Sequence, residues 1–278
     1  KPQIPTLTKI EPGNKKATLI LSDGTSRDIR ESREVIQVKD SKLQIDSSGL
    51  IVTPDSIPAK QGKIEYHTLS VPRGGEYNLT LSDGTQVWLN SESELRYPTS
   101  FVGEKREVFL TGEGYFSVAH DEKQPFIVVS SDIYTKVYGT EFNVRSYGDE
   151  EVHVTLVQGR VSVKKTEGGS EYTLNPGENA RFVESVPEIT KVNVNRYIAW
   201  KDGYFYYENE SLESIMDDLK RWYDFDVVYV GNRVKDYRFE LWVSRDSEIS
   251  VITDLLMKTN RVGIKVNGKT LVVSEVVR

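Results

Sequence analysis

The amino-acid sequence predicts a mainly β protein, in which an all-β region of stacked short strands and hairpins precedes a small α+β domain. Three observations support this fold class. Aromatic and β-branched residues are abundant, including 15 Tyr, 9 Phe and 4 Trp, and these types fit the half-buried surface of a sheet. Short apolar runs recur at intervals of about 8 to 12 residues between residues 66 and 182, which is typical of a sandwich, barrel or solenoid. After about residue 192 a helical period of apolar residues appears.

The chain is long enough for more than one domain. Its 278 residues exceed the usual size of a single hydrophobic core, so at least two cores are expected. We expect an N-terminal β-hairpin region with a linker at 1–65, an all-β domain at 66–192 and an α+β domain at 193–278. Residues 1–5, with two prolines, are typical of a linker.

A repeated pentapeptide lies in the first hundred residues, where Leu-Ser-Asp-Gly-Thr occurs at 21–25 and again at 81–85. In both places an alternating apolar run leads into Asp-Gly, a pair that accepts positive φ and favours a type I′ hairpin turn. Five identical residues at the same phase favour duplication of a β unit over two independent hairpins with a common turn.

The all-β region is expected to contain a series of short strands punctuated by glycines. Strand-like runs lie at 86–90, 107–110, 115–118, 126–129, 134–138, 142–144, 152–156 and 160–163. None of these segments keeps an apolar period of about 3.6 residues, so no helix is expected here. The pattern leaves a sandwich and a short solenoid both open, and the repeated turn favours stacked hairpins with solenoid character.

The residues from about 200 onward predict the order β-α-β-β-α-β-β. A strand at 200–207 precedes a helix capped by Ser211, whose inward face carries Leu212, Ile215, Met216, Leu219 and Trp222. The further expected elements are strands at 226–230 and 237–243, a helix from about 247 with Asn260 as its C-cap, and strands at 262–266 and 270–276 around an Asn-Gly turn.

Composition and charge exclude several classes of function. A net charge of −6 and a pI of about 5.4 argue against a nucleic-acid partner, which needs a basic face. The sequence has no run of about 18 apolar residues, the length that a membrane helix requires. It has no cysteine, which excludes thiol catalysis, zinc–thiolate sites and disulfides within it.

Residues suited to catalysis are few and scattered. His67, His120 and His153 lack the spacing of a metal site, and His153 is expected to face solvent because its strand neighbours are apolar. The acidic clusters at 149–151 and 217–218 are expected to be solvated charges, not the paired carboxylates of a glycosidase. The sequence also lacks a nucleophile elbow and a phosphate-binding loop. We therefore predict a protein that is not an enzyme and has no catalytic residues, cofactor or metal.

A series of motifs carries a family resemblance. They occupy 71–98, from Val-Pro-Arg-Gly-Gly to Leu-Arg-Tyr-Pro, then 106–118, 125–126, 137–144, 156–161 and 174–180, in this order. Together they resemble the FecR family of Bacteroidetes-type anti-sigma factors. The part from 199 to the end is similar to the secretin/TonB short N-terminal domain.

The resemblance implies a periplasmic signal-relay protein. Members of this family receive a signal from the N-terminal signalling domain of an outer-membrane TonB-dependent transporter and control an extracytoplasmic-function sigma factor. Their cytoplasmic segment binds the sigma factor and a single inner-membrane helix anchors them. Neither part is in this sequence, so Lys1 is expected to mark a truncation and the chain is not expected to bind the sigma factor by itself.

The resemblance fixes no contact residues, so we take them from the strand expected at 237–243. Trp242 alternates with apolar Leu241 and Val243 and shares its face with charged residues, which is a signal of interaction. The candidate partner-binding residues are Tyr237, Arg238, Glu240 and Trp242.

A glycan-binding module is the alternative function, since exposed aromatic rings can stack on sugars. Its candidate residues are Trp88, Tyr97 and Trp242. A β-solenoid carbohydrate-active enzyme is disfavoured, because it would need carboxylates clustered on one sheet face.

Overall fold

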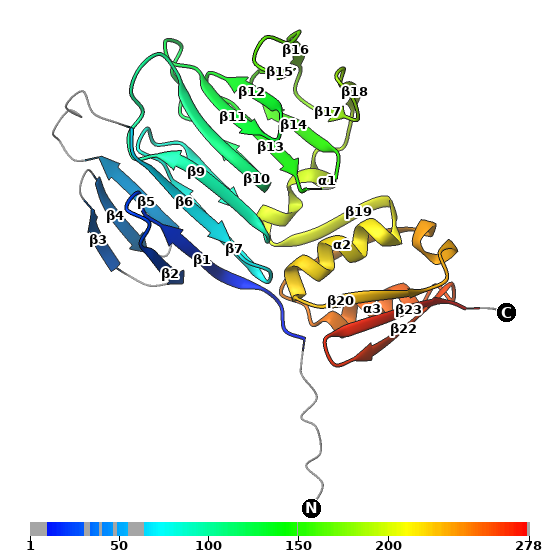
Figure 1. The fold of residues 1–278 in the computed structure, drawn as a ribbon. Coiled ribbons are helices and arrows are strands. Elements are labelled where there is room, and N and C mark those ends of the chain that lie inside the picture. The colour runs from blue at the N-terminus through cyan, green and yellow to red at the C-terminus, as the bar shows by residue number, and fades with distance from the viewer. Residues whose placement is uncertain are drawn as a thin grey trace, which may run out of the picture. The chain divides into compact units, whose positions relative to one another are not determined.

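The computed structural model describes residues 10–30, 34–38, 41–46, 49–54, 64–148 and 150–276 (Figure 1). The chain divides into two compact units, one of residues 15–201 and one formed by residues 202–278 together with those before 15. The first unit is built of strands with a short helical segment at its end, and the second mixes helices with strands. The predicted fold class, a β-rich region followed by a small α+β domain, is confirmed. The linker expected at 1–5 lies outside the described residues.

The strands of the first unit form two sheets. In order across the first sheet they are β2 (Ser26–Arg30), β1 (Asn14–Ile20), β6 (Tyr66–Val71), β9 (Ser93–Pro98), β10 (Arg106–Ser117), β11 (Phe126–Ser130), β12 (Ile133–Val137), β15 (Val161–Lys165) and β16 (Tyr172–Leu174). Across the second sheet they are β3 (Glu34–Val38), β4 (Ser41–Asp46), β5 (Gly49–Pro54), β7 (Gly75–Thr80), β8 (Gln86–Leu89), β10, β13 (Glu141–Ser146), β14 (Val152–Gln158), β17 (Glu178–Phe182) and β18 (Glu188–Lys191).

Strand β10 belongs to both sheets. Its first half pairs with β9 and β11, and its second half, from Gly112, pairs with β8 and β13. Gly112 has a φ of +90°, and a Cβ atom there would lie 2.4 Å from the Ser93 hydroxyl. Only glycine fits where the strand passes from one sheet to the other.

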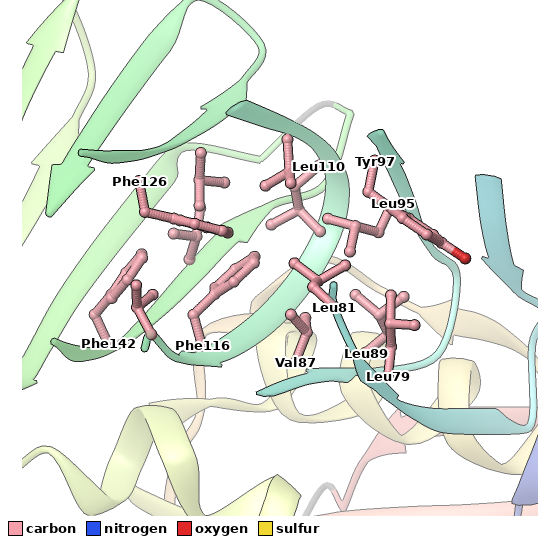
Figure 2. Close-up of a cluster of buried hydrophobic side chains, with 14 of the residues drawn as sticks. Leu79, Leu81, Val87, Leu89, Leu95, Tyr97, Leu110, Phe116, Phe126 and Phe142 are labelled. Carbon is pink, nitrogen blue, oxygen red and sulfur yellow. The ribbon is translucent and has the colours of Figure 1, made fainter. Parts of the chain in front are cut away.

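The inner faces of the two sheets share one hydrophobic core. Phe116, Phe126 and Phe142 meet within it, and the rings of Phe116 and Phe142 stack with centroids 5.2 Å apart (Figure 2). The chain alternates between the sheets one hairpin at a time, in the order β11–β12, β13–β14, β15–β16 and β17–β18. The unit is therefore a sandwich of two sheets. Its chain passes from one sheet to the other after each hairpin, so successive hairpins are stacked, as expected.

The two Leu-Ser-Asp-Gly-Thr turns have the same geometry, but it is not type I′. Within each turn only the glycine, Gly24 or Gly84, has positive φ. The carboxylates of Asp23 and Asp83 each accept the backbone N–H of the Thr two residues later, at 2.9 Å and 3.0 Å. Gly24 and Gly84 also donate to the carbonyl of the Leu three residues earlier. This is a type I turn followed by a left-handed glycine, since the Asp side chain holds its own residue at negative φ.

The compact units do not coincide with the domain limits expected from the sequence. Strand β1 pairs with β6, and β5 pairs with β7, so residues on both sides of position 65 share one unit. The second limit differs as well, because the short helices α1 (Asn195–Ile198) and η1 (Ala199–Asp202) belong mostly to the sandwich unit.

The second unit has the predicted order of elements. These are β19 (Tyr204–Ser211), α2 (Leu212–Tyr223), β20 (Asp226–Val230), η2 (Arg233–Asp236), β21 (Arg238–Ser244), α3 (Ile249–Met257), β22 (Val262–Asn267) and β23 (Thr270–Glu275). Strands β19 and β21 form a two-stranded sheet, while β20, β23 and β22 form a three-stranded sheet. Both helices and the inner faces of both sheets share one core.

Helix α2 begins as the sequence predicts. The Ser211 hydroxyl accepts the backbone N–H of Ser214 at 3.2 Å, and the five predicted apolar residues are buried. Two local predictions are wrong. Residues 200–202 are helical, so the strand starts only at Tyr204, and α3 ends at the C-cap Lys258, with Asn260 left-handed two residues beyond. Among the described residues no helix combines the length and apolarity needed to cross a membrane.

Candidate functional site

The outer face of the two-stranded sheet is the candidate site. Strand β21 alternates as predicted, with Phe239 and Leu241 buried against the helices and Glu240 and Trp242 exposed. Trp242 is 73% exposed, the largest exposed fraction among the large hydrophobic residues described. An aromatic ring held in water by a rigid strand costs little entropy to bury, which is typical of interface anchors.

Two tyrosines of β19 support this tryptophan. Tyr206 lies directly opposite Trp242 in the strand register, and Tyr204 is its diagonal neighbour. The ring centroids lie 5.7 Å and 6.2 Å from that of Trp242, and both tyrosine rings meet it edge-on at 86°. This T-shaped geometry is the favoured one for aromatic pairs, so the trio of Tyr204, Tyr206 and Trp242 is a preformed aromatic surface.

The other predicted contact residues divide between two places. Arg238 and Glu240 share the outer face with Trp242, and Arg238 donates to the backbone carbonyl of Asn209 at 2.8 Å. Tyr237 does not join them, because it precedes the strand. Its hydroxyl donates to the Glu275 carboxylate, which raises the Tyr237 pKa, and Arg261 stacks 4.5 Å from its ring. Tyr237 thus binds β21 to the end of β23.

The two sheets of this unit have unpaired strand edges. Within the described part of the chain, β19 and β21 pair with each other alone, and the three-stranded sheet ends at β20 and β22. On β20, the side chains of Val228 and Val230 are 51% and 58% exposed. Such edges offer free N–H and C=O groups to an added strand.

Of the three aromatics predicted to bind glycans, only Trp242 is freely exposed. Tyr97 is completely buried in the sandwich core, opposite His67 on β6. Trp88 lies on the outer face of the second sheet, where its ring packs edge-on against Tyr115 at 5.6 Å. Trp88 was expected to be exposed, but it packs against the cluster that Tyr115 forms with Ile198 and Trp200.

The acidic clusters are engaged in ion pairs. Arg145 binds Glu150 at 2.8 Å, and Arg181 binds Glu151 through both carboxylate oxygens, which lowers the Glu151 pKa. Asp149 lies outside the described residues. On α2, Asp217 and Asp218 pair with Lys220 and Arg221. Carboxylates held by arginine and lysine are poor general acids or bases, and no group of three metal-ligating side chains occurs in the described ranges.

His153 does not face solvent as predicted. It lies on the outer side of β14 as expected, but the ring of Tyr197 on α1 packs against it with ring centroids 6.0 Å apart. The imidazole also forms a hydrogen bond of 3.1 Å with the Asn179 side-chain amide. Burial, and secondarily the nearby Arg145, lowers the His153 pKa to about 4. The covering helix has only one turn, which is too short to show an apolar period in the sequence.

The comparisons with known proteins agree with this architecture. The model described as FecR protein matches residues 67–162, and the model described as FecR, C-terminal, matches residues 204–273. The chain belongs to the FecR family. The two matched segments fall in the sandwich unit and the α+β unit, so the FecR assignment covers both.

Solved structures extend the FecR comparison to three dimensions. Two crystal structures of a candidate anti-sigma factor from Parabacteroides distasonis ATCC 8503 superpose with a TM-score of 0.69 at 27% identity. The alignments cover 76% of this chain and 99% and 100% of the two relatives. Among curated proteins none matches this chain.

Proposed function

We propose that this FecR-family chain is the signal-receiving, periplasmic part of an anti-sigma regulator. The observation that carries the proposal is the paired match of the FecR and FecR C-terminal models, supported by the likeness to the candidate anti-sigma factor of Parabacteroides distasonis. The described residues offer a preformed aromatic surface and open strand edges. These are features of a protein that acts by binding.

The partner would be the N-terminal signalling domain of an outer-membrane TonB-dependent transporter. In this proposal the trio of Tyr204, Tyr206 and Trp242 anchors the contact, and a free sheet edge adds backbone hydrogen bonds. Binding would be passed through the parent protein's single inner-membrane helix to an extracytoplasmic-function sigma factor on the other side. The sigma factor itself would meet a different segment of the parent protein.

Titration calorimetry with the purified signalling domain of the transporter encoded beside this chain tests the proposal. We expect Trp242→Ala to weaken binding by about 30-fold, because a buried interface anchor contributes about 2 kcal/mol. The matched control is Tyr138→Ala on the sandwich unit, a 41% exposed aromatic that should leave binding unchanged. Absence of binding at high micromolar concentration would contradict direct contact.

Glycan binding is the second candidate, and the aromatic trio favours it as well. A tryptophan face flanked by two edge-on tyrosines can stack on a sugar ring. Calorimetric titration with polysaccharides, in the absence of the transporter domain, separates the two functions. Affinity for a sugar that Trp242→Ala abolishes would favour the glycan-binding module and count against the relay.

A further inference from the structure

The outer face of the second sheet carries polar side chains in two regular rows. The strand register places Glu113, Arg145, His153 and Arg181 side by side across β10, β13, β14 and β17. The neighbouring row runs across β8, β10, β13, β14 and β17 and consists of Trp88, Tyr115, Asn143, Thr155 and Asn179. Yet Glu113, Asn143, Thr155 and Asn179 are at most 3% exposed. These four polar side chains are of the kind found on protein surfaces but are buried, while Arg181 at the margin of the face is 43% exposed.

The polar groups of this face bind one another. The Glu113 carboxylate accepts the side-chain amides of Asn90 at 2.9 Å and Asn143 at 3.0 Å, and Arg145 approaches it at 3.4 Å. The Thr155 hydroxyl donates to Asn179 at 2.9 Å. Because these bonds lie within the sheet, they remain when the cover is removed. A permanent interlayer would be expected to be apolar, since burying polar groups carries a desolvation cost.

The cover is the stretch 194–201, which contains α1 and most of η1 and which we name the strap. Trp200 donates its indole N–H to the side-chain oxygen Oδ1 of Asn143 at 3.3 Å, and the Lys201 ammonium lies 4.8 Å from the centre of the Tyr115 ring. Ile198 and Trp200, each 9% exposed, form with Tyr115 a small apolar cluster distinct from the sandwich core.

The strap's own helical structure cannot hold it in place. Helix α1 is one turn of four residues without an acidic residue in that turn, and at its start the Asn193 side chain accepts the backbone N–H of Asn195 at 3.2 Å. A helix of this length is unstable in water unless it is packed against something. Docking on the sheet therefore decides whether the strap is ordered at all.

We propose that the strap is a releasable latch, docked in the structure through Trp200 and Ile198, whose release uncovers the polar rows of the second sheet. Three features carry this inference: the marginal helix, the small separate apolar cluster, and a covered face whose polar groups are already satisfied. Strand β19 starts at Tyr204, three residues after the strap. A force on that strand would therefore be transmitted along the chain to Trp200 before it reached the strands of the sandwich. The device is independent of which partner the chain binds.

Limited trypsin digestion of the full chain tests the latch, because the strap contains two cleavage sites, Arg196 and Lys201. We expect Trp200→Ala to raise cleavage at these sites by at least about tenfold, since cleavage follows the population of the open form. Cleavage at Lys136 in β12 should stay unchanged. The matched control is Trp242→Ala, which removes an exposed tryptophan and should leave the strap protected.

Cysteine labelling gives a second measurement, because the chain has no native cysteine. Val157 on β14 packs against the strap cluster, and its neighbour Gln158 is exposed. In the otherwise unaltered chain, Val157→Cys should react with a maleimide much more slowly than Gln158→Cys. Adding Trp200→Ala should remove most of that difference.

Two results would overturn the latch. If Trp200→Ala raises cleavage equally at sites throughout the sandwich and lowers its melting temperature, the segment is an integral part of the fold. If cleavage and labelling do not respond to Trp200→Ala, Trp200 does not hold the strap. Trp200→Phe keeps most of the packing and loses the indole bond, so it should give an intermediate cleavage rate.

Discussion

Replacing Arg106 by methionine would remove the centre of a buried clasp in the sandwich. Its guanidinium donates to the Asp83 carboxylate at 2.7 Å and to the carbonyls of Ala119 at 2.8 Å and Gln124 at 2.9 Å. The side chains of Arg106 and Asp83 are 2% and 13% exposed. The clasp thus fixes the second Leu-Ser-Asp-Gly-Thr turn to the connection between β10 and β11.

The expected loss of stability follows from these contacts. Removing one partner of a buried ion pair costs about 3 to 5 kcal/mol, and the slight exposure of Asp83 favours the lower end of that range. Since about 1 kcal/mol shifts the melting temperature of a domain of this size by about 2 to 4 °C, we expect a drop of roughly 6 to 12 °C. Calorimetry measures it, with hydrogen exchange in β10 and β11 identifying the transition of the sandwich unit.

The repeat provides a matched control for this experiment. Asp23 holds the same place in the first turn and makes the same bond to the Thr two residues later, but it lies on the exposed surface. Asp83→Asn should lower the melting temperature because it leaves the buried Arg106 without its counter-charge, while Asp23→Asn should change it little. Equal effects at the two positions, or an Arg106→Met variant within about 2 °C of the parent, would refute the reasoning.

Three further predictions concern the backbone, a helix cap and pH. Gly112→Ala should destabilise the sandwich by on the order of 3 kcal/mol in urea unfolding, since φ is +90° and the new Cβ meets Ser93. Gly84→Ala, also at positive φ but with open space around it, should cost only about 1 to 2 kcal/mol. Ser211→Ala should cost about 1 kcal/mol and speed hydrogen exchange in the first turn of α2. The His153 pKa of about 4 lies below the ordinary 6.5, so the unfolded chain takes up the proton first as the pH falls. The free energy of unfolding should therefore decrease between pH 6.5 and pH 4, by as much as about 3 kcal/mol, and His153→Asn should flatten this decrease in a pH series of urea titrations. If the free energy of unfolding of His153→Asn depends on pH as it does in the parent chain, His153 is not the group responsible for the decrease.

The α+β unit could be predicted well from the sequence because its signals are local. Helix α2 has a hydroxyl cap, an acidic first turn and apolar residues on one face over three turns, and the structure keeps all three features. The alternation in β21 likewise placed Trp242 and Glu240 on the outer face. Period and capping depend on neighbouring residues, so one sequence is sufficient to find them.

The covered face could not be predicted, because alternation separates the two sides of a strand without showing what packs on each. His153 was assigned correctly to the outer side of β14, but its exposure depends on Tyr197, more than 40 residues later. Trp200 was assigned to a strand because an aromatic strand follows it directly, and a single helical turn shows no period. Tyr97 was expected on the surface but lies in the core, since it shares the inner face of β9 with Leu95.

The alternation of hairpins between the two sheets has a consequence for how the sandwich assembles. Each new hairpin pairs with the one placed two hairpins earlier, as β15 does with β12 and β17 with β14. Every step therefore needs only chain that has already been made, and it closes a loop of modest length. We expect the sandwich to form vectorially from its N-terminal end, layer after layer, as the polypeptide emerges from a ribosome or a translocation channel.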